Sequence, residues 1–192
     1  LSKKLKNGEE IKLHIGSGRN YLENWINIDF SKRTKKDLSF DVRKGIPFPS
    51  NSVDYIFSEH FIEHITYNEG LFYFSEVFRV LKNGGVLRTA FPDLDFIIES
   101  YQNDSWREKE WVKLTNAQWY PSRCFMLNEC IRENGLHKYI YNVDDIIRLQ
   151  KEVGFFSDDI YVTEVMKSSY KQFIEIEKRK DSTVVEAVKN IK

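Results

Sequence analysis

The sequence contains little cysteine, no long apolar run and no excess of charge of either sign. Its two cysteines, Cys124 and Cys130, are too few and too poorly spaced for a zinc ribbon or a disulfide scaffold in a chain of 192 residues, so we expect a reducing, cytoplasmic location. No apolar run approaches the roughly 20 residues of a membrane span, and no signal peptide is expected. Lysine plus arginine and aspartate plus glutamate both total 29, so no global field favours nucleic acid.

The length and the order of the apolar segments predict a single α/β domain over residues 1–192. Short apolar runs predict strands at 11–15, 25–29, 37–41, 53–58, 85–91, 159–166 and 183–189. Alternation of strands and helices, followed by a strand pair, predicts a three-layer α/β/α sandwich. Its sheet should be mainly parallel with an antiparallel C-terminal strand.

Two helices are predicted from periodicity and capping residues. Residues 67–82 carry apolar side chains at three- and four-residue steps, and Thr66 with Glu69 forms a capping box. Residues 143–153 follow the capping residue Asn142.

A glycine turn after the first strand predicts a nucleoside-cofactor site. Gly16 and Gly18 let backbone N–H groups approach a ligand that a Cβ would block, and Asp29, at the end of the next strand, can accept hydrogen bonds from ribose hydroxyls. Only ten residues separate Gly18 from Asp29, too few for a crossover with a full helix. We therefore expect a shortened first crossover, which does not suit a dinucleotide pyrophosphate.

A series of short motifs carries a family resemblance. They are Leu13-His14-Ile15-Gly16-Ser17-Gly18, Asn27-Ile28-Asp29, Phe40-Asp41-Val42, Ser52-Val53-Asp54-Tyr55-Ile56, Glu59-His60-Phe61-Ile62-Glu63-His64, Arg79-Val80-Leu81-Lys82-Asn83-Gly84-Gly85 and Ala90-Phe91-Pro92-Asp93-Leu94. In this order the series resembles the class I methyltransferases that use S-adenosylmethionine (SAM), and most of all the small predicted methyltransferases of cell-surface polysaccharide loci. The resemblance implies a Rossmann-like fold.

The resemblance also implies cofactor-binding roles for individual residues. Gly16, Ser17 and Gly18 would pass under the methionine part of SAM, and Asp29 would bind the ribose hydroxyls. Asp41 would accept from the adenine amino group, with Val42 facing the ring, and Ser58 and Glu59 would line the methionine side. The chain departs from the family pattern at His14, which replaces an acidic residue, and at Asn20, which replaces a third glycine.

The segment from His60 to His64 also fits the zinc motif H-x-x-E-H. That motif requires one long helix, whereas here a strand should end at Ser58 and Thr66 should cap a new helix. A third ligand is also unassigned. A zinc hydrolase is therefore the less favoured interpretation, and we expect no bound metal.

Three polar residues are candidates for catalysis. His60 follows the fourth strand at the carboxyl edge of the sheet, where ligands bind in open α/β folds, and an imidazole can act as a general base near neutral pH. Asp93 follows the fifth strand, where capping of the next helix is an equal interpretation. His137 could reach the substrate side, whereas His14 lies inside a strand and is interpreted as structural.

Residues 101–140 are expected to form a cover over the acceptor. Their aromatic side chains could stack on a sugar ring or could pack helices onto the sheet; they are Tyr101, Trp106, Trp111, Trp119, Tyr120 and Phe125. Together these expectations describe transfer of a methyl group from SAM to a small-molecule or saccharide acceptor. The alternative is a SAM- or nucleoside-binding module without catalysis. The sequence does not indicate the oligomeric state.

Overall fold

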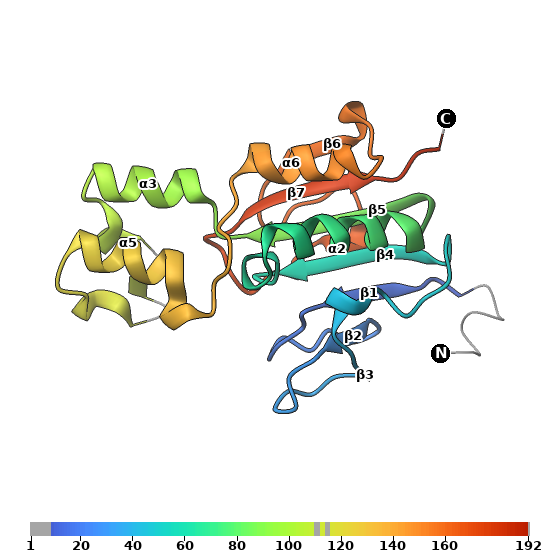
Figure 1. The fold of residues 1–192 in the computed structure, drawn as a ribbon, viewed down its shortest axis with the longest axis horizontal. Helices are drawn as coiled ribbons and strands as arrows, with labels where there is room; N and C mark the ends of the chain where they lie inside the picture. Colours follow the sequence, from blue (N-terminus) through green and yellow to red (C-terminus); the bar gives the residue numbers. More distant parts are fainter. Residues whose placement is uncertain (1–8, 110–111, 114–115, 192) are drawn as a thin grey trace.

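The centre of the protein is a seven-stranded sheet (Figure 1). A computed structural model describes residues 9–109, 112–113 and 116–191. The strands are β1 (Lys12–Ile15), β2 (Ile26–Asp29), β3 (Leu38–Ser39), β4 (Val53–Glu59), β5 (Leu81–Phe91), β6 (Ile160–Thr163) and β7 (Thr183–Val188). Their order is β3-β2-β1-β4-β5-β7-β6. β1 to β5 are parallel, and β7 runs antiparallel to both of its neighbours, β5 and β6.

The predicted fold class is confirmed: the sheet is Rossmann-like and mainly parallel, with an antiparallel C-terminal strand. The shortened first crossover is confirmed as well, because the segment between β1 and β2 contains only turns. The strand predicted at 37–41 is reduced to the two residues of β3, and β6 is shorter than the predicted 159–166. Both lie toward the outside of the sheet, where fewer ladder partners fix the ends of a strand.

Two helices cover one face of the sheet (Figure 1). In α2 (Tyr67–Val80) the predicted capping box of Thr66 and Glu69 is present, and α6 (Val143–Glu152) is capped by Asn142 as predicted. Their apolar sides pack on buried side chains of the sheet, which include Leu13, Ile56, Leu87 and Val185.

The other face is covered mainly by irregular chain and the short helix η7 (Lys171–Phe173). Phe173 packs there with Trp25 and Tyr55. The fully buried guanidinium of Arg88 pairs with the carboxylates of Glu177 and Glu186. Irregular chain thus covers this face in place of a layer of helices. The ion pairs of Arg88 fix this chain to the sheet.

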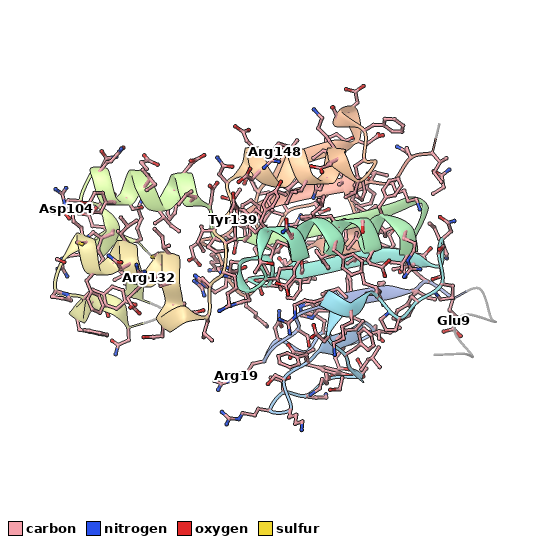
Figure 2. All side chains as sticks on the ribbon, in the orientation of Figure 1. Glu9, Arg19, Asp104, Arg132, Tyr139 and Arg148 are labelled. Atoms are coloured by element: carbon pink, nitrogen blue, oxygen red, sulfur yellow. The ribbon has the colours of Figure 1, made fainter. Side chains whose placement is uncertain are left out.

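A cover lobe, residues 94–135, lies beyond the carboxyl ends of the parallel strands (Figure 1). It contains α3 (Leu94–Gln102), η3 (Trp106–Glu108), η4 (Ala117–Trp119), α5 (Arg123–Arg132) and η5 (Glu133–Gly135). Trp106, Val112, Ala117 and Met126 form its own small core. Figure 2 shows Arg132 within this lobe and Tyr139 where the chain returns to the sheet. None of the described helices is long and apolar enough to cross a membrane.

Candidate functional site

The glycine turn has the conformation that only glycine adopts easily. Gly16 and Gly18 have φ values of +65° and +50°. A Cβ on Gly16 would lie 2.6 Å from Cδ2 of Phe61, whereas the space around Gly18 is open. The N–H of Gly18 donates to Oδ2 of Asp29 at 2.7 Å, and the N–H of Ser31 donates to Oδ1 at 2.6 Å. The turn and the Asp29 carboxylate are thus fixed to each other.

A pocket of about 440 Å³ opens beside this turn, and we call it the glycine pocket. Five of the predicted cofactor residues line it, namely Gly16, Gly18, Asp29, Asp41 and Val42. The other lining residues are Ile28, Phe30, Ser31, Phe40, Arg43, His60, Phe61, His64 and Ile65. Sequence reasoning missed Phe30, whose ring is 65% exposed at the pocket although it directly follows Asp29.

Asp41 is held in place by its neighbour Arg43. The guanidinium donates to both carboxylate oxygens at 2.8 Å, and this pairing lowers the pKa of Asp41 below its ordinary value. The carboxylate also caps η1 (Val42–Lys44) by accepting from the N–H of Arg43. Asp41 therefore stays ionised, with a fixed orientation at the rim of the pocket.

Three other predicted cofactor residues lie outside the pocket lining. Ser17 and Ser58 are buried. Glu59 is nearly buried, and its Oε1 accepts from the backbone N–H groups of Lys178 and Arg179 at 2.7 and 2.8 Å. Burial raises the pKa of Glu59, although those two donors act in the opposite direction. Glu59 thus fixes the segment before β7 to the end of β4.

A second pocket, of about 180 Å³, lies between the sheet edge and the cover lobe, and we call it the cover pocket. Its walls come from the residues that follow β4 and β5, from α3, from the segment 120–137 and from the segment before β7. The lining residues are His60, Pro92, Asp93, Phe96, Ile97, Tyr120, Glu129, Cys130, Glu133, His137, Arg179 and Asp181. All three predicted catalytic candidates, His60, Asp93 and His137, meet here. No sequence motif indicated the contribution of Arg179 and Asp181.

His60 lines both pockets. Its φ of +47° is unusual for a residue with a side chain, and such strain is found where surrounding contacts demand it. Nδ1 lies 3.1 Å from Oε1 of Glu63, and Nε2 lies 3.0 Å from Oγ of Ser182. The imidazole is thus held between Glu63 and Ser182, with Nε2 hydrogen-bonded to the Ser182 hydroxyl.

Asp93 both caps α3 and faces the cover pocket. It accepts from the N–H of Asp95 and from Oγ1 of Thr183, each at 3.0 Å. Burial raises its pKa, and these hydrogen bonds offset only part of that effect. The two interpretations of Asp93 from the sequence, helix cap and site residue, are thus compatible.

His137 is bound on both ring nitrogens. Nδ1 lies 2.7 Å from the carbonyl oxygen of Cys130, and Nε2 lies 3.0 Å from Oε2 of Glu133. Burial lowers the pKa of His137, but the bonds to Glu133 and Cys130 outweigh burial, so the pKa is raised. The hydrogen bond between His137 and Glu133 also lowers the pKa of Glu133.

The H-x-x-E-H segment is not a regular helix. η2 (Ile62–His64) is a single 3₁₀ turn, and His60 precedes it with a left-handed conformation. His60 and His64 therefore do not share one helix face, which agrees with the argument against a zinc hydrolase. His14 is 1% exposed, stacks on Phe57 and contacts Asn27, as expected for a structural residue.

The predicted aromatic cluster divides into different environments. Trp106 is fully buried in the cover lobe, whereas Trp119 is 67% exposed and packs on Tyr120 and Phe125. Of the cluster, only Tyr120 is among the described residues that line the cover pocket. Trp111 lies outside the described residues. Most of the described cluster thus packs the lobe, and one ring faces the site.

Comparison with known proteins agrees with this geometry. Residues 15–89 match a family model described as a methyltransferase domain. No curated protein matches the sequence. A SAM-dependent methyltransferase from Thermotoga maritima, described as a possible histamine N-methyltransferase, is 17% identical, with a TM-score of 0.60 over 98% of this chain and 86% of that chain.

Two further solved structures have the same fold. A SAM-dependent methyltransferase from Archaeoglobus fulgidus is 15% identical, with a TM-score of 0.59 over 98% of this chain and 92% of that chain. A phosphoethanolamine N-methyltransferase from Haemonchus contortus, solved with S-adenosylhomocysteine, is 18% identical, with a TM-score of 0.50 over 95% of this chain and 49% of that chain.

The match to a methyltransferase domain covers residues 15–89, and on this fold it supports an enzyme that uses SAM as its cofactor. The glycine pocket suits SAM chemically. Its wall at Gly16 has no room for a Cβ, and Asp29 has two acceptor oxygens, each with capacity beyond its present backbone bond. SAM has no phosphate, so the missing first crossover helix removes nothing that this cofactor needs.

Proposed function

We propose that the protein transfers the methyl group of SAM to a hydroxyl or amine of a small polar acceptor in the cover pocket, and that this acceptor is a saccharide. The observation that carries the proposal is that the glycine pocket and the cover pocket share His60. The resemblance to methyltransferases of polysaccharide loci favours a precursor of a surface glycan.

Different residues of the glycine pocket would bind different parts of the cofactor. Gly16 and Gly18 bring the backbone to the methionine part, Asp29 accepts from the ribose, and Asp41 faces the adenine beside Val42. The exposed ring of Phe30 offers a flat surface at the same pocket. SAM supplies an electrophilic methyl group on its sulfonium.

The residues of the cover pocket would position and deprotonate the acceptor. Nε2 of His60 would exchange its hydrogen bond with the Ser182 hydroxyl for one with the acceptor and take a proton from it. Asp93 and the paired Arg179 and Asp181 offer hydrogen-bond partners to hydroxyl or amino groups. Alignment of the acceptor with the methyl group supplies much of the remaining rate.

The test is a transfer assay with labelled SAM against saccharide precursors and small amines. We expect one of the saccharide precursors to become labelled. His60→Ala should lower the rate of transfer about 10²- to 10⁴-fold, while S-adenosylhomocysteine still binds to this variant. Labelled amines without labelled saccharides would refute the saccharide assignment. Cofactor binding with no transfer to any acceptor would instead favour the non-catalytic SAM-binding module.

A further inference from the structure

Glu63 is a buried carboxylate that lacks adequate partners. The residue is 1% exposed, and neither carboxylate oxygen accepts a hydrogen bond by geometry from any described residue. Nδ1 of His60 lies 3.1 Å from Oε1, which leaves Oε2 without a donor. An ionised carboxylate is costly to bury unless a cation or several donors compensate it. A cation within reach of Oε2 would compensate this charge.

The ring of His137 also has a nitrogen that could bind a cation. Both ring nitrogens face acceptor oxygens, the Cys130 carbonyl at 2.7 Å and the Glu133 carboxylate at 3.0 Å. A neutral imidazole can donate to only one of them. With Nδ1 donating to the carbonyl, Nε2 is the nitrogen that can bind a metal ion, which would replace the proton that Nε2 now directs at Glu133. A metal-binding histidine usually donates its second ring nitrogen in this way.

These groups converge with His64. One ligand atom each from Glu63, His64 and His137 lies within 4.8 Å of the others, and Oε2 of Glu133 lies 4.0 Å from Nε2 of His64. A backbone hydrogen bond joins the two segments, since the N–H of Lys138 donates to the carbonyl of Glu63 at 2.7 Å. Ligands at about 2 Å from a tetrahedral zinc lie about 3.3 Å apart, so the side chains would rotate toward one another on binding.

We propose that Glu63, His64 and His137 bind one divalent transition-metal ion, represented here by zinc. Two imidazoles and one carboxylate are a donor set of zinc sites that keep a coordination position open. The carboxylates of Glu63 and Glu133 together balance the charge of a divalent ion. Sequence analysis gave no third ligand, because His137 is more than 70 residues away from His64 in the chain.

The location of the site gives the ion a specific role. His64 lines the glycine pocket and His137 lines the cover pocket, so the ion lies at the wall between them. An acceptor must present its reacting atom near this wall. We assign the open coordination position to an oxygen of the acceptor, which the ion would hold in place. This role rests on the proposed function, whereas the metal site itself does not.

The test is a metal titration of the tag-free, full-length protein after treatment with a chelator. We expect one equivalent of Co²⁺ to bind with the visible absorption of a low-symmetry site, and Zn²⁺ to displace it. His64→Ala and His137→Ala should each weaken binding at least about a hundredfold. Glu63→Gln, which preserves shape, should also weaken it. Glu129→Gln, a carboxylate of the cover pocket outside the cluster, should bind as the unchanged protein does.

Binding of S-adenosylhomocysteine shows whether each variant is folded and separates the two proposals. The metal site is overturned if no metal binds. It is also overturned if the unchanged protein and both histidine variants bind metal equally well. Transfer at full rate in the presence of a chelator overturns the role of the ion and leaves the proposed function standing. One bound equivalent without transfer to any acceptor supports the site and refutes the proposed function.

Discussion

The glycine pocket and the cover pocket differ in how their walls are distributed along the chain. The glycine pocket is lined entirely by residues 16–65, mostly at strand ends and in the loops that follow them. The cover pocket combines residues from His60 to Asp181. The first is therefore readable as a local pattern, whereas the second exists only after the cover lobe and the C-terminal segment have packed against the sheet.

The two pockets also differ in what holds their shape. At the glycine pocket the backbone itself is constrained, by Gly16 against Phe61 and by Gly18 bonded to Asp29. At the cover pocket the shape depends on charged side chains, such as the pair of Arg179 and Asp181 at 3.0 Å. Small backbone changes should therefore damage the first pocket, and changes of charge should damage the second.

The largest effect is expected from a methyl group at the glycine turn. Gly16→Ala places a Cβ against Phe61 in a left-handed conformation, so we expect a loss of about 3 to 5 kcal/mol in the free energy of unfolding, together with loss of S-adenosylhomocysteine binding. Gly18→Ala is the matched control, with the same strain but open space, and should cost about 1 to 2 kcal/mol. Urea unfolding and calorimetry measure both. Equal costs would show that Phe61 does not define this wall.

A smaller effect is expected on the free energy of unfolding at low pH, through His14 in β1. Burial lowers the pKa of His14 to about 4, so the unfolded chain binds a proton at His14 before the folded one does. This contribution to stability is complete above pH 6.5 and is lost as the pH falls toward 4, by up to about 3 kcal/mol. Urea unfolding at pH 7 and pH 4.5 should show a smaller difference for His14→Gln than for the unchanged protein. An identical difference would refute the depressed pKa.

The smallest effects distinguish packing from recognition among the aromatic residues of the cover lobe. Trp106→Leu should lower the free energy of unfolding by about 2 to 3 kcal/mol, and Trp119→Leu by less than about 0.5 kcal/mol, because only Trp106 is buried. Tyr120→Leu should raise the acceptor KM about 2- to 10-fold through loss of its ring face, with cofactor affinity unchanged. If Trp119→Leu abolishes turnover instead, the acceptor stacks outside the cover pocket.

The sequence was sufficient for the elements with strong local patterns. The capping box of Thr66 and Glu69 fixed the start of α2, and the ten residues between Gly18 and Asp29 ruled out a first crossover helix. It was insufficient where contacts between distant segments decide the structure. Glu59 binds the backbone of residues 178–179, and Glu63 lies beside His137, yet neither relation leaves a periodic or compositional trace.

Calorimetric titration of S-adenosylhomocysteine into Asp29→Ala and Asp93→Asn tests most directly whether the cofactor and the acceptor occupy separate pockets. Asparagine keeps the helix cap at Asp93 while removing its charge. We predict that Asp29→Ala weakens cofactor binding by about 1.5 to 3 kcal/mol through loss of charged acceptors, and that Asp93→Asn leaves it unchanged but slows methyl transfer. Equal weakening in both variants, or no change in Asp29→Ala, would contradict the account.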